Sequence, residues 1–318
     1  MGKILKPWFV VRCSLFVVGA WFGACTPGDK PTEQQLIDHK TDVDAWYNKR
    51  IEDLKSNNGW LNLAGLFWLN EGINSFGSDE GNDIVFPSGK IAGKAGYFMV
   101  KGGMVTLIPS KDAGITIYGQ PVQKDVVVFH PDSARAVKQL QGSITRHGSL
   151  EWHVIRRDDK MGIRLRDLES DVLKSFRGIE RYPVEYSWRV KAEFEPASAG
   201  ATIDITNVLG QTTAQDLAGI YVFELNGKQH RLSATAGTSK KLFVVFADPT
   251  NGKETYPAGK FIYIDKPDST GVAFIDFNKS YNPPCAFTEF ATCPLPPKEN
   301  ILAAAITAGE KNYDLHNQ

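Results

Sequence analysis

Short runs of β-forming residues, separated by turns about every ten positions, place the strongest limit on the fold of this chain. Branched and aromatic residues dominate each run, and glycine (29) and proline (17) are spread along all 318 residues. This spacing is typical of antiparallel sandwiches. The runs in the first half are residues 83–87, 96–100, 104–108, 114–118, 126–129, 152–156 and 162–166.

The second half has the same β-rich pattern. Asn226-Gly227 predicts a tight hairpin, because this dipeptide readily takes positive φ at both central turn positions. We therefore expect an antiparallel sandwich or a partly closed barrel in this half. The predicted strands are residues 186–194, 201–205, 219–225, 229–234, 241–246, 260–264 and 272–277.

One amphipathic helix is predicted before the β runs. Thr32 and Gln35 suit its start, and Asn57-Asn58-Gly59 suits its end. Its apolar positions should pack against the body of the protein. They are Leu36, Ile37, Val43, Trp46, Tyr47, Ile51 and Leu54.

The segment after the helix, residues 59–70, is apolar and is interrupted by Gly65. We expect it to be a buried connection to the first sheet. The whole fold is predicted to be mainly β, with an N-terminal helix and two sandwich-like halves that meet within residues 168–180. The predicted parts are a signal peptide (1–24), a tether (25–31), the helix (32–57), a first β domain (58–170) and a second β domain (171–318).

The N-terminus has the pattern of an export signal. Basic residues precede a short apolar run, which ends in Phe22-Gly23-Ala24-Cys25. The run is too short for a comfortable membrane span. We expect Cys25 to carry lipid and to anchor the protein to a bilayer of the cell envelope, facing the periplasm or the exterior. An ordinary signal peptide or an uncleaved anchor is the alternative.

Four cysteines are present, and the export signal accounts for two of them. Cys13 would leave with the signal peptide, and Cys25 would carry lipid. The remaining pair, Cys285 and Cys293, is then expected to form a disulfide, because exported proteins mature in oxidising surroundings. A nucleophilic Cys285 would instead need a free thiol and a nearby base.

Composition excludes several classes of function. Hydrophobic residues make up 42% of the chain, charged residues 23%, and the formal net charge is zero, as in ordinary globular proteins. No basic stripe predicts nucleic-acid binding. The six histidines form no zinc-binding motif. We expect no metal and no cofactor.

Polar residues concentrate near the C-terminus, around the proline-rich segment that holds Cys285 and Cys293. Carboxylate, amide and phenol groups together could bind a polar molecule or supply a general acid and base. Alternatively, Asp and Asn before a Pro-Pro turn cap backbone groups. The candidates are Asp276, Asn278, Tyr281, Asn282, Asn300 and Glu310.

A second group of oxygen-bearing side chains lies in residues 248–256. Asp248-Pro249-Thr250-Asn251-Gly252 is first of all a turn signal. Asp248 and Tyr256 are nevertheless added to the ligand-binding candidates, because this turn could lie opposite the C-terminal group.

The first half resembles a forkhead-associated type of sandwich. Residues 76–87 are similar to the early turn and strand of such domains, and Tyr118-Gly119-Gln120 lies where they place a hairpin. Those domains hold phosphothreonine with an arginine just after the early glycine. Ser78 follows Gly77 here, so the resemblance implies an architecture and not phosphopeptide binding.

The tail resembles the DUF1684 family of bacterial proteins. The similarity rests on residues 281–287, 291–297 and 308–311, and on Gly59–Leu66. Lys260 and Lys279 stand where the family pattern has arginine. The resemblance implies a mainly β fold and no established activity.

Three functions remain open at this point. The first is a binding protein for a small polar or saccharide-like ligand or for an envelope partner. The second is a hydrolase or lyase that uses Asp276 or Glu310 with Tyr281. The third is a structural scaffold.

Overall fold

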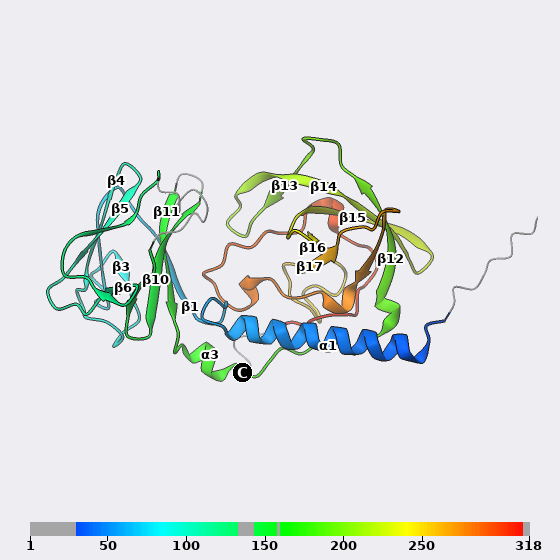
Figure 1. The fold of residues 1–318 in the computed structure, drawn as a ribbon, viewed down its shortest axis with the longest axis horizontal. Coiled ribbons are helices and arrows are strands. Elements are labelled where there is room, and N and C mark those ends of the chain that lie inside the picture. The colour runs from blue at the N-terminus through cyan, green and yellow to red at the C-terminus, as the bar shows by residue number, and fades with distance from the viewer. Residues whose placement is uncertain (1–29, 133–142, 158–159, 314–318) are drawn as a thin grey trace, which may run out of the picture.

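The structure, a computed structural model, describes residues 30–132, 143–157 and 160–313 (Figure 1). The fold is mainly β, with one long N-terminal helix and two β-rich halves, as the spacing of the runs predicts. The predicted signal peptide, Cys25 and most of the tether lie outside the described residues. Within the described ranges, no helix is long and apolar enough to cross a membrane.

The predicted helix is confirmed as α1 (Glu33–Lys55). The Thr32 hydroxyl accepts from the Gln35 backbone N–H at 3.2 Å, and the Gln35 side chain accepts from the Thr32 N–H at 2.8 Å. This reciprocal pair satisfies two N–H groups that have no partner inside the helix. The helix therefore begins where the sequence predicts.

The helix runs along one side of the second half (Figure 1). Val43, Leu54 and His39 are its buried residues. Leu36 and Ile37, which we expected on the packed face, are 43% and 52% exposed. The contact with the body therefore begins about one turn after the start of the helix.

The first half consists of two facing sheets. One has the strand order β3-β2-β4-β5-β8, and the other β1-β11-β10-β9-β6-β7. Their strands are β1 (Leu63–Trp68), β2 (Gly72–Gly77), β3 (Ile84–Val85), β4 (Gly96–Lys101), β5 (Met104–Pro109), β6 (Thr116–Ile117), β7 (Gln120–Pro121), β8 (Val126–Phe129), β9 (Thr145–His147), β10 (Leu150–Arg157) and β11 (Lys160–Asp167).

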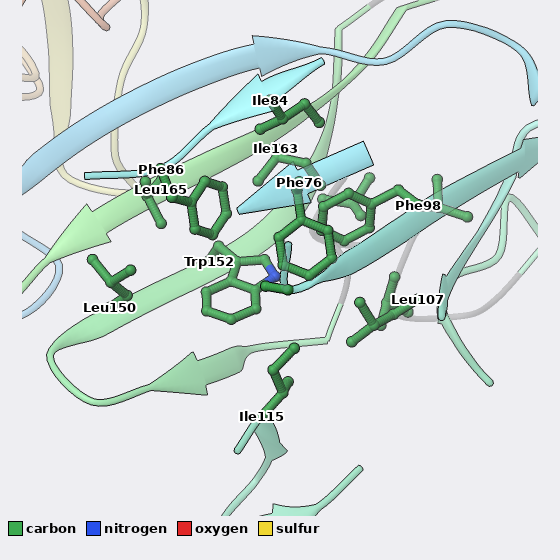
Figure 2. Packing of buried hydrophobic residues seen from close by; sticks show 14 of the residues in the cluster. Phe76, Ile84, Phe86, Phe98, Leu107, Ile115, Leu150, Trp152, Ile163 and Leu165 are labelled. Carbon is green, nitrogen blue, oxygen red and sulfur yellow. The ribbon is translucent and has the colours of Figure 1, made fainter. Parts of the chain in front are cut away.

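Side chains from both sheets share one core (Figure 2). Phe76 of β2 stacks on Phe98 of β4 with 4.5 Å between ring centroids. Trp152 of β10 meets Phe86 edge-on at 5.3 Å. Because the core draws on strands of both sheets, this half is a sandwich.

The connection predicted over residues 59–70 is instead partly a strand, β1. It pairs antiparallel with the edge of β11, with Trp68 opposite Gly162. A register shift between Leu63 and Gly65 marks a bulge at its start. The sequence lacks the apolar–polar alternation of a half-buried strand, so its pairing was not predicted.

The second half is a nearly closed barrel. Its sheet has the order β17-β16-β15-β14-β12-β18, with β13 beside β14, and β17 contacts β18 across the remaining gap. Asn226 and Gly227 take φ of 54° and 70°, as the hairpin prediction requires. The elements are α3 (Asp171–Ser175), η1 (Tyr186–Trp188), β12 (Arg189–Pro196), β13 (Thr202–Thr206), β14 (Thr212–Leu225), β15 (Lys228–Ala236), β16 (Lys241–Phe246), β17 (Lys260–Asp265), β18 (Val272–Asp276), η2 (Phe277–Lys279), η3 (Pro284–Ala286) and η4 (Lys298–Asn300).

Candidate functional site

Asp276 and Asn278 fasten the end of β18. One Asp276 carboxylate oxygen accepts from the Asn278 backbone N–H at 3.2 Å and from its side-chain N–H at 2.8 Å. The Asn278 amide also bonds both backbone groups of Glu185, at 2.9 and 3.1 Å. The other Asp276 oxygen meets His39 Nε2 of α1 at 2.9 Å. Asp276 therefore both caps a turn and holds the helix.

Glu310 joins three distant segments. Its side chain is 1% exposed, and its two oxygens accept from Arg50 Nε at 3.0 Å and from the Asn282 backbone N–H at 2.7 Å. The Asn282 amide donates to Lys311 O at 2.7 Å. A buried carboxylate whose two oxygens both accept hydrogen bonds holds these segments together and is not a free acid or base.

Tyr281 lies in a group of rings rather than in a polar cleft. The Arg50 guanidinium lies over its ring at 4.5 Å, and Trp46 of α1 is tilted against it at 6.2 Å. Burial raises the pKa of its phenol above the ordinary value. The phenol therefore loses its proton less readily than an ordinary tyrosine does.

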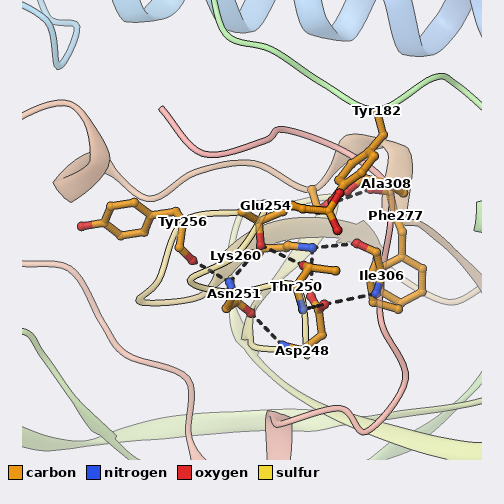
Figure 3. Close-up of polar contacts among 12 residues, drawn as sticks. Tyr182, Asp248, Thr250, Asn251, Glu254, Tyr256, Lys260, Phe277, Ile306 and Ala308 are labelled. Atoms are coloured by element: carbon orange, nitrogen blue, oxygen red, sulfur yellow. Dashed lines mark hydrogen bonds and ion pairs between the residues drawn. The ribbon is translucent and has the colours of Figure 1, made fainter. Parts of the chain in front are cut away.

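Asp248 forms a buried ion pair with Lys260 (Figure 3). Tyr256, from the same turn, points away from this pair (Figure 3). The Tyr256 ring packs against a small apolar cluster at the C-terminal end of α1, which includes Leu54 and Leu61. Burial raises the pKa of the Tyr256 phenol. The turn prediction for this segment is borne out, since Asn251 bonds the backbone of both Asp248 and Tyr256.

Asn300 fixes the proline-rich segment to the outside of the barrel. It is 1% exposed. Its amide oxygen accepts from Ser233 N at 2.7 Å, and its amide N–H groups donate to Ser233 O at 2.9 Å and Val245 O at 2.8 Å. The segment therefore lies against β15 and β16.

The predicted disulfide between Cys285 and Cys293 is present, with 6.2 Å between the two Cα atoms. We call residues 285–297, the cross-linked loop and the prolines that follow it, the clasp. It covers Val245 and Phe261 on the outer face of β16 and β17. The clasp thus closes over the barrel wall.

Replacing Cys293 by serine is expected to lower the free energy of unfolding by about 2–3 kcal/mol, because a short closed loop removes only a modest amount of entropy from the unfolded chain. Chemical denaturation of the oxidised protein and the variant measures this difference. Adding a reductant should bring the unsubstituted protein to the stability of the variant. Equal stability of all three samples would contradict a structural disulfide.

A small pocket opens between the clasp and the barrel wall, with a volume of about 80 Å³. Ser233 and Thr235 of β15 bring hydroxyls to it, Phe243 brings an aromatic ring, and Asn300 is part of its wall. The remaining lining residues are Ile203, Ile205, Gln215, Val245, Pro294 and Pro297.

An aromatic row begins at this pocket and follows the outer face of the barrel. Phe243 contacts Tyr263 at 5.0 Å, and Tyr263 stacks on Tyr281 at 6.4 Å with 15° between the ring planes. Trp46 of α1 continues the row beyond Tyr281. Tyr263 is 41% exposed, so one ring of the row is open to a ligand.

The eight predicted ligand-binding residues therefore do not form one site. Asp276, Asn278, Asn282 and Glu310 make structural bonds, and Asp248 is paired inside the barrel. Asn300 borders the pocket, and Tyr281 belongs to the aromatic row. In the described part of the chain, no group of three or more His, Cys, Asp or Glu could hold a metal ion.

Residues 174–311 match a family model described as DUF1684, a protein of unknown function. A similar solved structure is an NMR structure of an uncharacterised protein of Haloarcula marismortui. It is 30% identical, with 43% of this chain and 78% of that chain covered and a TM-score of 0.37. The chain belongs to the DUF1684 family. The DUF1684 match contains the pocket, the clasp and all eight predicted residues, whereas α1 lies before it.

A second solved structure comes from work on phosphothreonine-dependent interactions of FHA domains. It is 16% identical to this DUF1684 protein, with 32% of this chain and 92% of that chain covered and a TM-score of 0.22. No curated protein gives a significant sequence match.

Sequence reasoning missed the residues that shape the pocket. Ser233, Thr235 and Phe243 lie in ordinary strand patterns, and their outward direction could be read from alternation with buried Leu232, Ala234 and Leu242. What alternation could not indicate is that the clasp stands over that face.

Proposed function

We propose that this protein is a lipid-anchored binding protein of the cell envelope, with a neutral, saccharide-like ligand at the pocket beside the clasp. The observation that carries the proposal is the composition of the pocket wall. Hydroxyl and amide groups stand beside an aromatic ring, and the ten described lining residues include no carboxylate, histidine or cation. Such a wall suits a ligand with hydroxyls and without charge.

The aromatic row supports the same ligand class. A sugar ring has polar edges and an apolar face, and the apolar face stacks on exposed aromatic rings. The pocket is smaller than the roughly 300–1,000 Å³ of sites that enclose a drug-sized ligand. It would therefore take the edge of one ring, while the rest of the ligand lies on Phe243 and Tyr263.

The anchor completes the proposal. The basic start, the short apolar run and Phe22-Gly23-Ala24-Cys25 support export and lipidation. The disulfide independently supports export, because disulfides persist in oxidising compartments outside the cytosol. The bilayer is then the partner of Cys25.

The hydrolase or lyase alternative has less support. Asp276 and Glu310 are each held by a basic side chain and a backbone N–H, and the pKa of Tyr281 is raised by burial. A purely structural role remains the outcome if no ligand binds.

We expect a panel of neutral mono- and oligosaccharides to include a ligand that raises the melting temperature of the mature protein at millimolar concentration. Tyr263→Ala should weaken binding about tenfold by removing the stacking surface. Tyr97→Ala is the matched control, because Tyr97 is similarly exposed, at 43%, but lies on the first half. Equal losses in both variants, or no ligand in the panel, would reject the site.

A further inference from the structure

Lys260 and Asp248 meet in the interior of the barrel. Their side chains are 1% and 0% exposed, and Lys260 Nζ lies 2.8 Å from Asp248 Oδ2 (Figure 3). The local fold sets this distance, since Lys260 begins β17 opposite Phe246, the last residue of β16, and Asp248 follows two residues later. An amine and a carboxyl group are thus held together away from water.

The contact is not an ordinary hydrogen bond. The Nζ–Oδ2 distance is that of an ion pair, yet Oδ2 has no geometrically suitable hydrogen-bond donor among the described residues. Lys260 Nζ donates instead to Ile306 O at 2.8 Å. Asp248 Oδ2 is therefore the less constrained of the two carboxylate oxygens.

The other oxygen, Oδ1, accepts from two backbone N–H groups, Thr250 at 2.9 Å and Ile306 at 3.1 Å. Two fixed N–H donors on one oxygen are the arrangement that stabilises negative charge when a nucleophile adds to a carbonyl carbon. These two donors would therefore stabilise the negative charge that forms on Oδ1 when Lys260 Nζ adds to the Asp248 carboxyl carbon.

Burial also favours the neutral amine that such an attack needs. Desolvation lowers the pKa of the Lys260 ammonium, and the charge of Asp248 opposes this change. The charge of Glu254, which accepts a 3.0 Å hydrogen bond from the Tyr182 hydroxyl, also opposes this lowering of the Lys260 pKa, but desolvation has the larger effect.

We propose that Lys260 and Asp248 condense into an intramolecular isopeptide bond, a modification that is separate from the proposed ligand binding. A proton passes from Nζ to Oδ2, which gives an amine and a carboxylic acid. Nζ then attacks the Asp248 carboxyl carbon, the N–C bond forms, and the bond from that carbon to Oδ2 breaks. One further Nζ proton leaves with Oδ2, so the products are an amide and one water, and no oxidant or reductant takes part.

Intact mass of the reduced, denatured mature protein tests the bond. We expect a mass about 18 Da below that of the unlinked chain, the loss of one water. In a tryptic digest, residues 242–253 should appear joined to residues 254–279, because an acylated Lys260 is no longer a cleavage site and Pro267 protects the bond after Lys266. This joined peptide separates the proposed bond from dehydration elsewhere.

Lys260→Arg is the matched control, since it keeps the positive charge but cannot form this amide, and its mass should show no loss of water. If the unsubstituted protein has its full mass and releases residues 254–260 as a separate peptide, the pair is an ion pair only and the proposal is wrong. This result comes from the unsubstituted protein, so it does not depend on any variant folding.

Discussion

Replacing Arg50 by alanine is expected to lower the free energy of unfolding by about 3–5 kcal/mol, as when one partner of a buried charge pair is removed. Glu310, at 1% side-chain exposure, would keep its charge and lose its cation. The Asn282 carbonyl would lose a 2.9 Å hydrogen bond and Tyr281 a stacked guanidinium. Equilibrium denaturation, followed by circular dichroism and tryptophan fluorescence, measures the change.

The neighbouring residue provides the control for Arg50. Lys49 is 65% exposed and pairs with Asp53 on the helix surface, so Lys49→Ala should cost no more than about 0.5 kcal/mol. Arg50→Lys should fall between the two, because an ammonium cannot serve Glu310 and the Asn282 carbonyl in the same planar geometry. If Arg50→Ala costs as little as Lys49→Ala, the buried pair does not hold α1 to the barrel.

Trp152→Ala should destabilise the first half by about 3–5 kcal/mol, because it leaves a large cavity among Phe76, Phe86 and their neighbours. If the halves are separate domains, as predicted, calorimetry should resolve two transitions. One midpoint should then fall by more than about 10 °C, while the other stays in place.

Two further substitutions test the reason for this loss. Trp152 Nε1 has no hydrogen-bond partner among the described residues, so Trp152→Phe should cost much less than Trp152→Ala. Ile73→Ala should change stability by no more than about 0.5 kcal/mol, because Ile73 is 62% exposed on the same sandwich. A single transition that moves as a whole would show instead that the halves unfold together.

The features that could be predicted from the sequence depend on neighbouring residues. Thr32 and Gln35 cap the helix within one turn, and Asn226-Gly227 forms its hairpin through its own backbone preferences. Most strands follow from branched and aromatic runs between turns. The disulfide could be predicted by counting cysteines, because the expected export signal accounts for two of the four and leaves one pair.

The remaining features depend on contacts between residues far apart in the chain. Nothing around His39 in the sequence indicates that it is buried against Asp276, 237 positions later. Glu310 was predicted as a candidate acid, but its hydrogen bond from Arg50 gives it a structural role. The pocket depends on the clasp folding back over β15 and β16, which neither segment indicates alone.

The pairing of Arg50 with Glu310 also has a consequence for the order in which the protein can be completed. The two residues are 260 positions apart: Arg50 lies in α1, the first described element, and Glu310 lies after η4, the last described element. At ordinary rates of synthesis, α1 would wait about 13–50 s for its partner. Until then Arg50 lacks its carboxylate, and a newborn chain that stops short of Glu310 can hold α1 only through earlier contacts, such as that of His39 with Asp276.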